Sequence, residues 1–467
     1  MKKILTLLLA LWMLTGCVAM AAENQLVVGS TTAMSGAFFT DLFGSNTADM
    51  DVRALLHGYN LMSWDHETGT YQINDSVVAG MAVSKDAQNN RVYTFDLYGD
   101  LKFSDGSAIT AKDYAFSILL TASPELAKLG GQSAAAGAIL GMESYQSGKS
   151  SVLRGVRLLS DTQMSITISK AYEPYFYEMA LFDYSPYPIS VLAPGCKVVD
   201  TEKGVGIVNA SGTGDAIFTA DLLQKTILDA ATGYMSHPSV VSGPYTLTSY
   251  DAQRGTASFA INPYYKGNED GEKPTIETIV YRSVANDEAI DLLLSGEVDL
   301  LNKMVAADTV SKGIQSIADQ PFSVANYPRS GLSMISFSCE RQTVSSKAVR
   351  QAIARCFDRD ALVKAYTGNF GLKADGYFGI GQWMYQLTAG TIQPPVADLP
   401  ANATAKETAA YEKTVAQWDA LSLDKLKDYP LDLDQAAKLL EQDGWRLGKD
   451  GLRAKKIDGK TVALDLT

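Results

Sequence analysis

Several aromatic residues of this sequence stand directly beside glycine or proline, where they could line a binding cleft. Tyr245 follows a Gly-Pro pair, and Trp383 and Tyr385 follow Gly381. An aromatic ring on a loop offers a ligand apolar contact, and its hydroxyl or indole nitrogen adds a hydrogen bond. We therefore expect Tyr245, Trp383 and Tyr385 to bind a ligand. The alternative is that these rings fill the core, which is at least as common a role for an aromatic residue.

The sequence carries none of the short motifs that are typical of common catalytic or cofactor sites. It has no Walker-type phosphate loop, no paired CxxC, no HExxH and no GxSxG. His57, His66 and His237 are too far apart in sequence to predict a metal cluster. The clustered glycines of residues 376–381 lack the strand-to-helix context of nucleotide binding, so they predict a loop. We expect no catalytic residue, no metal and no cofactor, although an exported hydrolase stays open as a less favoured alternative.

The first twenty residues have the pattern of an export signal. Two lysines precede an apolar run from Ile4 to Leu14, which is shorter than the ~20 residues of a membrane-spanning helix. The run ends in Leu14-Thr15-Gly16-Cys17, which resembles a lipobox, where the cysteine sulfur receives a diacylglyceryl group. We expect residues 1–16 to be removed and a lipid on Cys17 to anchor the protein to a membrane. The alternative is an ordinary signal peptide that is cut near Ala21, and both interpretations export the protein.

The composition predicts a folded, acidic protein with more than one domain. At ~150 residues per domain, 467 residues favour about three domains or two large ones. Hydrophobic residues make up 46% and charged residues 20%, as in ordinary globular proteins. The net charge of −12 argues against nucleic acid as the main partner, because phosphate binding needs a basic face.

Three cysteines remain after Cys17, so at least one stays free or pairs outside the chain. Cys356 shares an apolar helical face with Val349 and Ala352, which predicts a buried thiol. A disulfide between Cys339 and Cys356 stays open.

The hydrophobic patterns predict two kinds of sheet. From about residue 59 to 169, alternating segments such as Arg91–Tyr98 predict an antiparallel block inserted into the chain. Ile276–Arg282, Asp287–Ser295 and Val298–Leu301 follow the order strand, helix, strand. This order predicts a βαβ unit with parallel strands.

Capping patterns predict where several helices begin. Thr110 with Asp113, and Thr404 with Glu407, have the spacing of a capping box. Asp432–Asp443 is amphipathic and is followed by Gly444, which predicts a helix with a defined end.

Five segments, taken in order, resemble the dipeptide/oligopeptide/nickel-binding family of bacterial extracellular solute-binding proteins, called family 5. The segments are Trp64-Asp65-His66-Glu67-Thr68-Gly69; Tyr93-Thr94-Phe95 with Phe103-Ser104-Asp105-Gly106 and Thr110-Ala111-Lys112-Asp113; Ser242-Gly243-Pro244-Tyr245-Thr246-Leu247 with Asn262-Pro263-Tyr264-Tyr265; Leu294-Ser295-Gly296-Glu297-Val298-Asp299; and Val349-Arg350-Gln351-Ala352-Ile353 with Asp358-Arg359-Asp360-Ala361-Leu362. Each is weak alone, but together and in order they are specific for the family.

The resemblance implies an α/β fold of two lobes, the type II periplasmic-binding-protein fold, with an extra antiparallel sub-domain. We expect lobe I at residues 26–58 and 170–283, the inserted sub-domain at 59–169, and lobe II at 284–467. A ligand held between the lobes would stabilise a closed form that a transporter can sense. The resemblance thus implies a lipid-anchored, monomeric receptor in the periplasm or on the outer face of the cell membrane. It would deliver peptides to the permease subunits of an ABC importer.

The resemblance is also compatible with other ligands and other roles, which stay open. Nickel chelates or sugars could replace peptides, and a sensory protein could present its ligand to a membrane receptor. The chain departs from the family at Ser338, where an asparagine is usual, and at its end. It stops at Thr467 in an expected strand, Thr461–Leu466, whereas family members continue. We expect a fragment of a longer reading frame, with lobe II incomplete.

Overall fold

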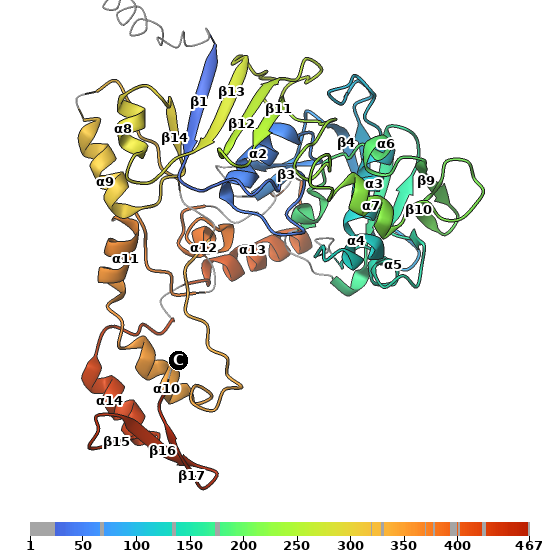
Figure 1. Cartoon of the computed structure of the whole chain (residues 1–467). Helices are drawn as coiled ribbons and strands as arrows, with labels where there is room; N and C mark the ends of the chain where they lie inside the picture. Colours follow the sequence, from blue (N-terminus) through green and yellow to red (C-terminus); the bar gives the residue numbers. More distant parts are fainter. Residues whose placement is uncertain are drawn as a thin grey trace, which may run out of the picture. The chain divides into compact units, whose positions relative to one another are not determined.

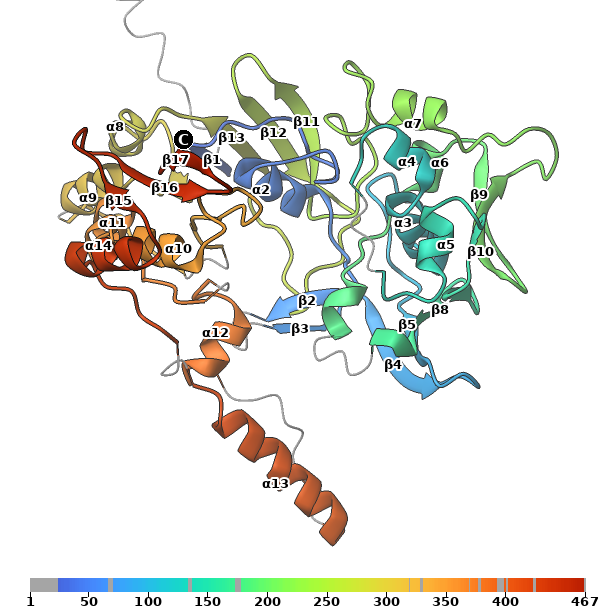
Figure 2. The ribbon, with the colours of Figure 1, turned by 90° about the horizontal axis from the view of Figure 1, so that it is seen from below.

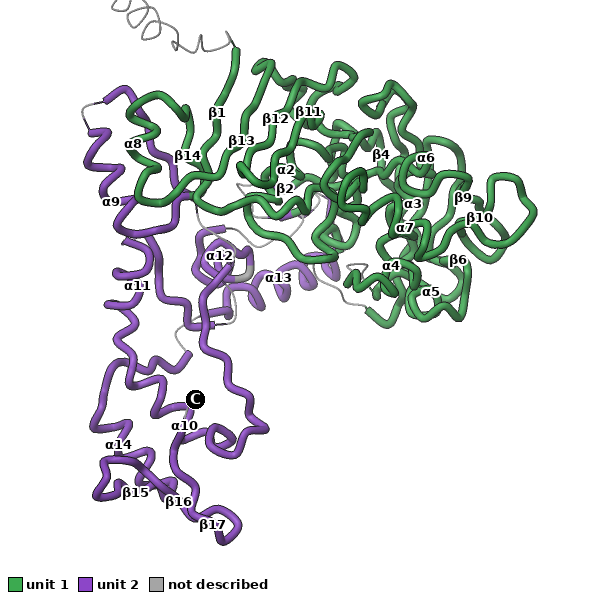
Figure 3. Tube along the Cα trace, in the orientation of Figure 1, with its two compact units in different colours: residues 1–63, 71–303 green, residues 64–70, 304–467 purple. Residues whose placement is uncertain are grey.

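The computed structural model of this chain divides into two compact units. It describes residues 24–65, 70–132, 137–172, 178–318, 320–327, 331–368, 370–376, 379–392, 399, 402–422 and 426–465. Unit 1 comprises Met1–Ser63 and Tyr71–Lys303, and unit 2 comprises Trp64–Thr70 and Met304–Thr467 (Figure 3). Cys17 and His66 lie outside the described residues.

A five-stranded sheet organises the first half of unit 1 (Figure 1). Its order is β11 (Tyr245–Asp251), β12 (Thr256–Ile261), β13 (Thr278–Ser283), β1 (Gln25–Ser30) and β14 (Leu300–Asn302). β1 is parallel to both β13 and β14, whereas β11, β12 and β13 pair in antiparallel fashion. α8 (Ala289–Leu294) connects β13 to β14, so the expected βαβ unit forms with β1 between its strands.

β14 belongs to this sheet because Asp299 fixes the chain just before it. The Asp299 carboxylate accepts a hydrogen bond from the Val27 amide at 2.7 Å, and the Asp299 amide donates to the Val27 carbonyl at 2.8 Å. The compact units accordingly divide after Lys303, twenty residues beyond the lobe boundary expected at 283.

α2 (Thr47–Leu56) packs against the five-stranded sheet. Its buried residues Val52 and Leu56 share one core with Phe259 and Ile279 from the strands. The helix begins in a capping box, in which Asn46 accepts from the Asp49 amide and Asp49 accepts from the Asn46 amide. One face of α2 is therefore fixed to the sheet.

Antiparallel strands and short helices build the second half of unit 1. The four-stranded sheet has the order β4 (Val78–Lys85), β5 (Arg91–Leu97), β8 (Gln163–Ile168) and β7 (Val156–Leu158), and the three-stranded sheet has the order β6 (Val152–Leu153), β10 (Gly204–Asn209) and β9 (Cys196–Thr201). The other elements are α4 (Pro124–Lys128), α5 (Met142–Gln146), η1 (Lys170–Tyr172), η2 (Glu178–Phe182), α6 (Ile189–Leu192) and α7 (Ala220–Thr226). The paired strands β2 (Met62–Asp65) and β3 (Thr70–Ile73) are divided between the two units, because Trp64–Thr70 belongs to unit 2.

α3 (Ala111–Thr121) is the central helix of this half and is buried along almost its whole length. Its expected capping box forms, with Thr110 and Asp113 in the predicted roles. The hydrophobic core around it continues through Leu192, Val205 and Tyr234, beyond residue 169, where the inserted block was expected to end.

Unit 2 consists of helices and a small antiparallel sheet (Figures 1 and 2). The helices are α9 (Ala307–Ser316), α10 (Lys347–Ala354), α11 (Arg359–Thr367), α12 (Trp383–Thr388), α13 (Ala405–Asp419) and α14 (Leu433–Gln442), and the strands are β15 (Arg446–Leu447), β16 (Arg453–Ile457) and β17 (Lys460–Ala463). α10 packs against α14, and Trp445 is buried at the end of this pair. The helix starts predicted at Thr404 and Asp432 are confirmed.

The cysteines of the described chain are free thiols, and the exposure of Cys356 differs from the prediction. The structure has free thiols at Cys196, Cys339 and Cys356, so a disulfide does not join the last two. Cys356 is exposed because α10 ends at Ala354, before the helical face could include it. The prediction of a buried thiol was therefore wrong.

No helix of the described part of the chain is long and apolar enough to cross a membrane.

Candidate functional site

A polar hollow of about 250 Å³ in unit 1 combines aromatic walls with charged groups. We call it the Tyr187 hollow, and its lining residues are Phe39, Thr40, Asp41, Arg53, Ala54, His57, Asn60, Ser185 and Tyr187. They come from the loop after β1, from α2, and from the segments before β2 and α6. Aromatic walls with a few convergent polar groups are what small-molecule sites usually offer.

Two residues of α2 and its C-cap residue His57, spaced four apart, hold the loop that forms one wall of this hollow. Asp49 accepts from the Ser35 amide at 2.8 Å, and Arg53 Nη1 donates to the Ala37 carbonyl at 2.7 Å. His57 Nε2 lies 3.0 Å from the carbonyl oxygen of Phe38. Residues at this spacing share one face of a helix. The spacing is a sequence signal that could have directed attention to this face of α2.

The electrostatics of the hollow favour an uncharged His57. Burial lowers the pKa of His57 to about 4, so the ring is neutral at pH 7 and its Nε2–H donates to Phe38. Burial, together with the nearby Asp41 carboxylate, raises the pKa of Tyr187. The Arg53 guanidinium already donates to Ala37 and Ser45. The exposed Asp41 carboxylate and the Tyr187 ring are thus the groups best placed to meet a ligand.

Edge-to-face ring contacts support the aromatic wall. The ring centroids of Phe39 and Tyr187 lie 4.7 Å apart, and those of Phe39 and Tyr234 lie 4.9 Å apart. Tyr234 is buried, and its hydroxyl donates to the Val240 carbonyl. This packing restricts the rings, so the wall is preformed.

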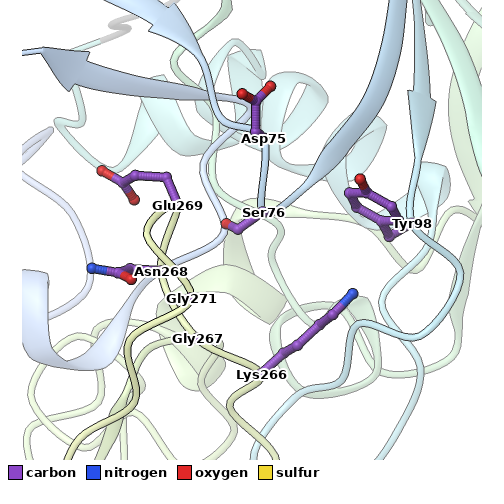
Figure 4. Close-up of a pocket in the computed structure, with 8 residues that line it drawn as sticks. All are labelled: Asp75, Ser76, Tyr98, Lys266, Gly267, Asn268, Glu269 and Gly271. Atoms are coloured by element: carbon purple, nitrogen blue, oxygen red, sulfur yellow. The ribbon is translucent and has the colours of Figure 1, made fainter.

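A second hollow of about 300 Å³ lies at the loop after β12 (Figure 4). Figure 4 shows the Lys266 side chain extending toward Tyr98, and its ammonium lies 4.5 Å from the centroid of that ring. The same ammonium pairs with the Asp100 carboxylate at 2.9 Å. The Lys266 amide donates to the Tyr59 hydroxyl at 2.6 Å. The charge of Lys266 is therefore already used to hold the loop, which favours a structural role for this hollow.

The residues predicted to bind ligand occupy two different environments. Tyr245 is 6% exposed at the start of β11, and its hydroxyl donates to the Ile276 carbonyl at 2.9 Å. These are the features of the core-filling alternative. Trp383 and Tyr385 are partly buried on α12, where we expected a loop. The expectation of a loop was wrong, because residues 383–388 form a short helix despite the neighbouring glycines. Tyr245 belongs to unit 1 and the other two to unit 2.

The described part of the chain contains no group of three or more His, Cys, Asp or Glu residues that could hold a metal ion. His57 donates to a backbone carbonyl, and His237 lies beside the Ser236 hydroxyl at 2.9 Å.

The chain is similar to known proteins both in sequence and in structure. The chain is 26% identical over 400 residues to the oligopeptide-binding protein OppA of Lactococcus lactis subsp. lactis, a match that covers 83% of this chain and 54% of that protein. It is also similar to the structure of lactococcal OppA complexed with an endogenous peptide in the closed conformation. That similarity has a TM-score of 0.63 at 19% identity and covers 94% of this chain and 70% of the other.

A third similarity is to NikZ from Campylobacter jejuni in complex with Ni(L-His). It has a TM-score of 0.55 at 16% identity and covers 94% of this chain and 66% of that one. The chain spans about half the length of the relatives that it matches in sequence.

These similarities show that the chain has the mixed α/β fold of the type II periplasmic binding proteins. The sequence model described as "Bacterial extracellular solute-binding proteins, family 5 Middle" matches residues 76–465, which is most of the chain. The chain therefore belongs to family 5 of the bacterial extracellular solute-binding proteins.

Proposed function

We propose that this protein captures oligopeptides and delivers them to the permease subunits of an ABC importer. The observation that supports this most is the family match over residues 76–465, together with a relative that is named as an oligopeptide-binding protein. The family is one of solute-binding proteins, so the proposal is capture without chemical conversion of the ligand.

The mode of capture that we propose is closure of two lobes around the ligand. Lobe I then corresponds to unit 1, which contains the expected residues 26–58 and 170–283, most of the inserted sub-domain 59–169, and residues 284–303. Lobe II corresponds to unit 2, which continues from Met304. Trp383 and Tyr385 contribute contacts to the ligand, whereas Tyr245, which is buried, fills the core of unit 1. A ligand can stabilise a closed form only by binding it more tightly than the open form. An aromatic wall such as that of the Tyr187 hollow, which binds by apolar contact, tolerates varied side chains.

We further propose that a lipid on Cys17 holds the protein outside the cytoplasm as a monomer at the membrane. The lipobox-like residues Leu14–Cys17 support this part of the proposal. Anchoring would keep the receptor close to its permease, which raises the effective concentration of the two partners.

A second ligand class has its own support, since the Campylobacter jejuni relative binds Ni(L-His). Mass spectrometry of ligands released from the purified protein separates the two classes. Peptide capture predicts a mixture of short peptides in about equimolar amount with the protein. Recovery of nickel with histidine, or of a sugar, in place of peptides would overturn the peptide assignment and keep solute capture.

A further inference from the structure

One carboxylate of unit 1 binds groups from two different strands of the sheet. Asp51 lies on α2, and its Oδ2 accepts from the Tyr281 hydroxyl of β13 at 2.9 Å and from Asn302 Nδ2 of β14 at 2.8 Å. Its Oδ1 pairs with the ammonium of Lys303. β13 and β14 are the two neighbours of β1, so one side chain joins the helix to the strands on both sides of β1.

Lys303 is also the last residue of unit 1. Its φ of 56° lies in the left-handed region, which is unfavourable for a residue with a Cβ atom. Charge pairing with Asp51, whose side chain is only 18% exposed, holds this conformation in place. The backbone direction at the end of β14 is therefore set by contacts within unit 1.

The residues that follow Lys303 have no regular structure until α9 begins. Residues 304–306 precede α9 (Ala307–Ser316), whose N-cap is Ala306. Val305 is 56% exposed, so little packing restrains it. A short, weakly packed segment directly after an anchored residue is where φ and ψ can change at least cost.

We propose that Asp51 is a positioning residue that locks the chain at Lys303, so that bending where the chain passes from Lys303 into unit 2 is confined to Met304–Ala306. Asp51 and Lys303 then define the unit 1 side of one hinge. The purpose of such a hinge rests on the proposed capture of ligand by closure, but the lock itself is measurable without any ligand.

The first test is amide hydrogen exchange of the ligand-free protein. Asp51→Asn and Lys303→Met both remove the ion pair, and Lys303→Met leaves a side chain in the left-handed conformation. We expect exchange of the amides of residues 300–303 to become about tenfold faster in both variants, with the β4 and β5 amides unchanged. Lys303→Gly, which relieves the conformation, should show a smaller increase than Lys303→Met.

The matched control is Lys112→Met, which removes an exposed ion pair with Asp161 elsewhere in unit 1. It should leave exchange at residues 300–303 within about twofold of the parent protein. Unchanged exchange there in both Asp51→Asn and Lys303→Met would overturn the proposal. Equal acceleration throughout unit 1 would also overturn it, since Asp51 would then act on general stability.

The second test measures movement between the units. Spin labels on the exposed Cys339 and on Glu143→Cys, in a Cys17→Ala, Cys356→Ser background, report the distribution of distances between unit 2 and unit 1. The lock predicts a broader distribution when Asp51→Asn is added, and no broadening with Lys112→Met. An unchanged width with Asp51→Asn would contradict a role in the hinge. Failure of peptide binding in a separate titration would affect only the proposed function.

Discussion

His57 is held as a neutral ring, and this has a consequence for stability at low pH. Its pKa is about 4 in the folded protein and about 6.5 in an unfolded chain. Between these values the unfolded chain binds more protons, so stability falls as pH decreases from 6.5 to 4 and the loss is complete below pH 4. The expected loss is up to roughly 3 kcal/mol.

His57→Gln should remove this part of the pH dependence. Denaturant unfolding at pH 7 and at pH 4.5 measures it, as the difference between parent and variant. Burial raises the pKa of Asp113 to about 6, which acts with the opposite sign in this window but is common to both proteins. His237→Gln serves as the control for the loss of a histidine elsewhere in unit 1. The same dependence in His57→Gln and the parent would contradict a buried neutral His57.

Lipid attachment also depends on a single residue. Changing Cys17 to Ala should abolish the diacylglyceryl mass increment and release the protein from the membrane fraction, because the lipid is the proposed anchor. Mass spectrometry of the intact protein and membrane fractionation provide the measurement. A parent protein that begins near Ala22 without added mass would favour the ordinary signal peptide.

Gly243 shows how one element constrains another. A Cβ on Gly243 would lie 2.5 Å from the Leu55 carbonyl oxygen and 2.6 Å from the Leu56 carbonyl carbon, at the end of α2. Next to it, Ser242 Oγ donates to the Gly58 carbonyl at 3.0 Å. The Ser-Gly-Pro-Tyr motif thus packs the start of β11 onto the end of α2.

Gly243→Ala should therefore destabilise unit 1 by about 1–3 kcal/mol, since the backbone must shift to admit a methyl group. Thermal unfolding measures the change. Gly99→Ala is the matched control, because its nearest contact of 3.4 Å is ordinary packing. Equal melting temperatures for the two variants would contradict the close approach.

The sequence could predict the elements that depend on local patterns. Capping residues mark the starts of α3 and α13 correctly, since a cap involves residues only three apart, and the amphipathic pattern of residues 432–443 predicts α14. It could not predict α12, where Gln382 provides no side-chain cap. It also could not place β1 between β13 and β14, because strand order depends on contacts between residues about 250 positions apart.

The candidate site was predictable only in part, for the same reason. The aromatic residues Trp383 and Tyr385 were chosen from neighbouring glycines, and the signal for a loop was wrong. Phe39, His57 and Tyr187 come together in the hollow from separate segments, so no local motif contains them. The spacing of Asp49, Arg53 and His57 by four residues, along α2 and its C-cap, is a local signal of this wall.

Substitutions of the aromatic residues on α12 and on β11 should have different effects. Trp383→Ala and Tyr385→Ala should each weaken peptide binding by ~2 kcal/mol with the fold intact, as expected for aromatic anchors. Tyr245→Ala should instead lower the melting temperature, because it leaves a cavity at a buried position. We expect the free energy of unfolding to fall by ~3 kcal/mol or more. Calorimetry with thermal unfolding of all three variants measures both effects. Unchanged affinity in the two α12 variants would remove that helix from the site.

At the scale of the whole molecule, two compact units and membership of a solute-binding family support a receptor that works by capture. The net charge of −12 is unfavourable for contacts with nucleic acid phosphates. Capture by closure requires that the ligand bind both units, so binding and compaction should occur together.

Calorimetric titration of the ligand-removed protein tests the central claim most directly. A pool of short peptides is the probe, and nickel with histidine and a sugar mixture are the comparison titrations. We expect saturable binding of peptides with a dissociation constant in the micromolar range or tighter, at about one site per chain, with the peptides recovered unchanged. Saturation by nickel with histidine or by a sugar but not by peptides, or recovery of cleaved peptides, would contradict peptide capture.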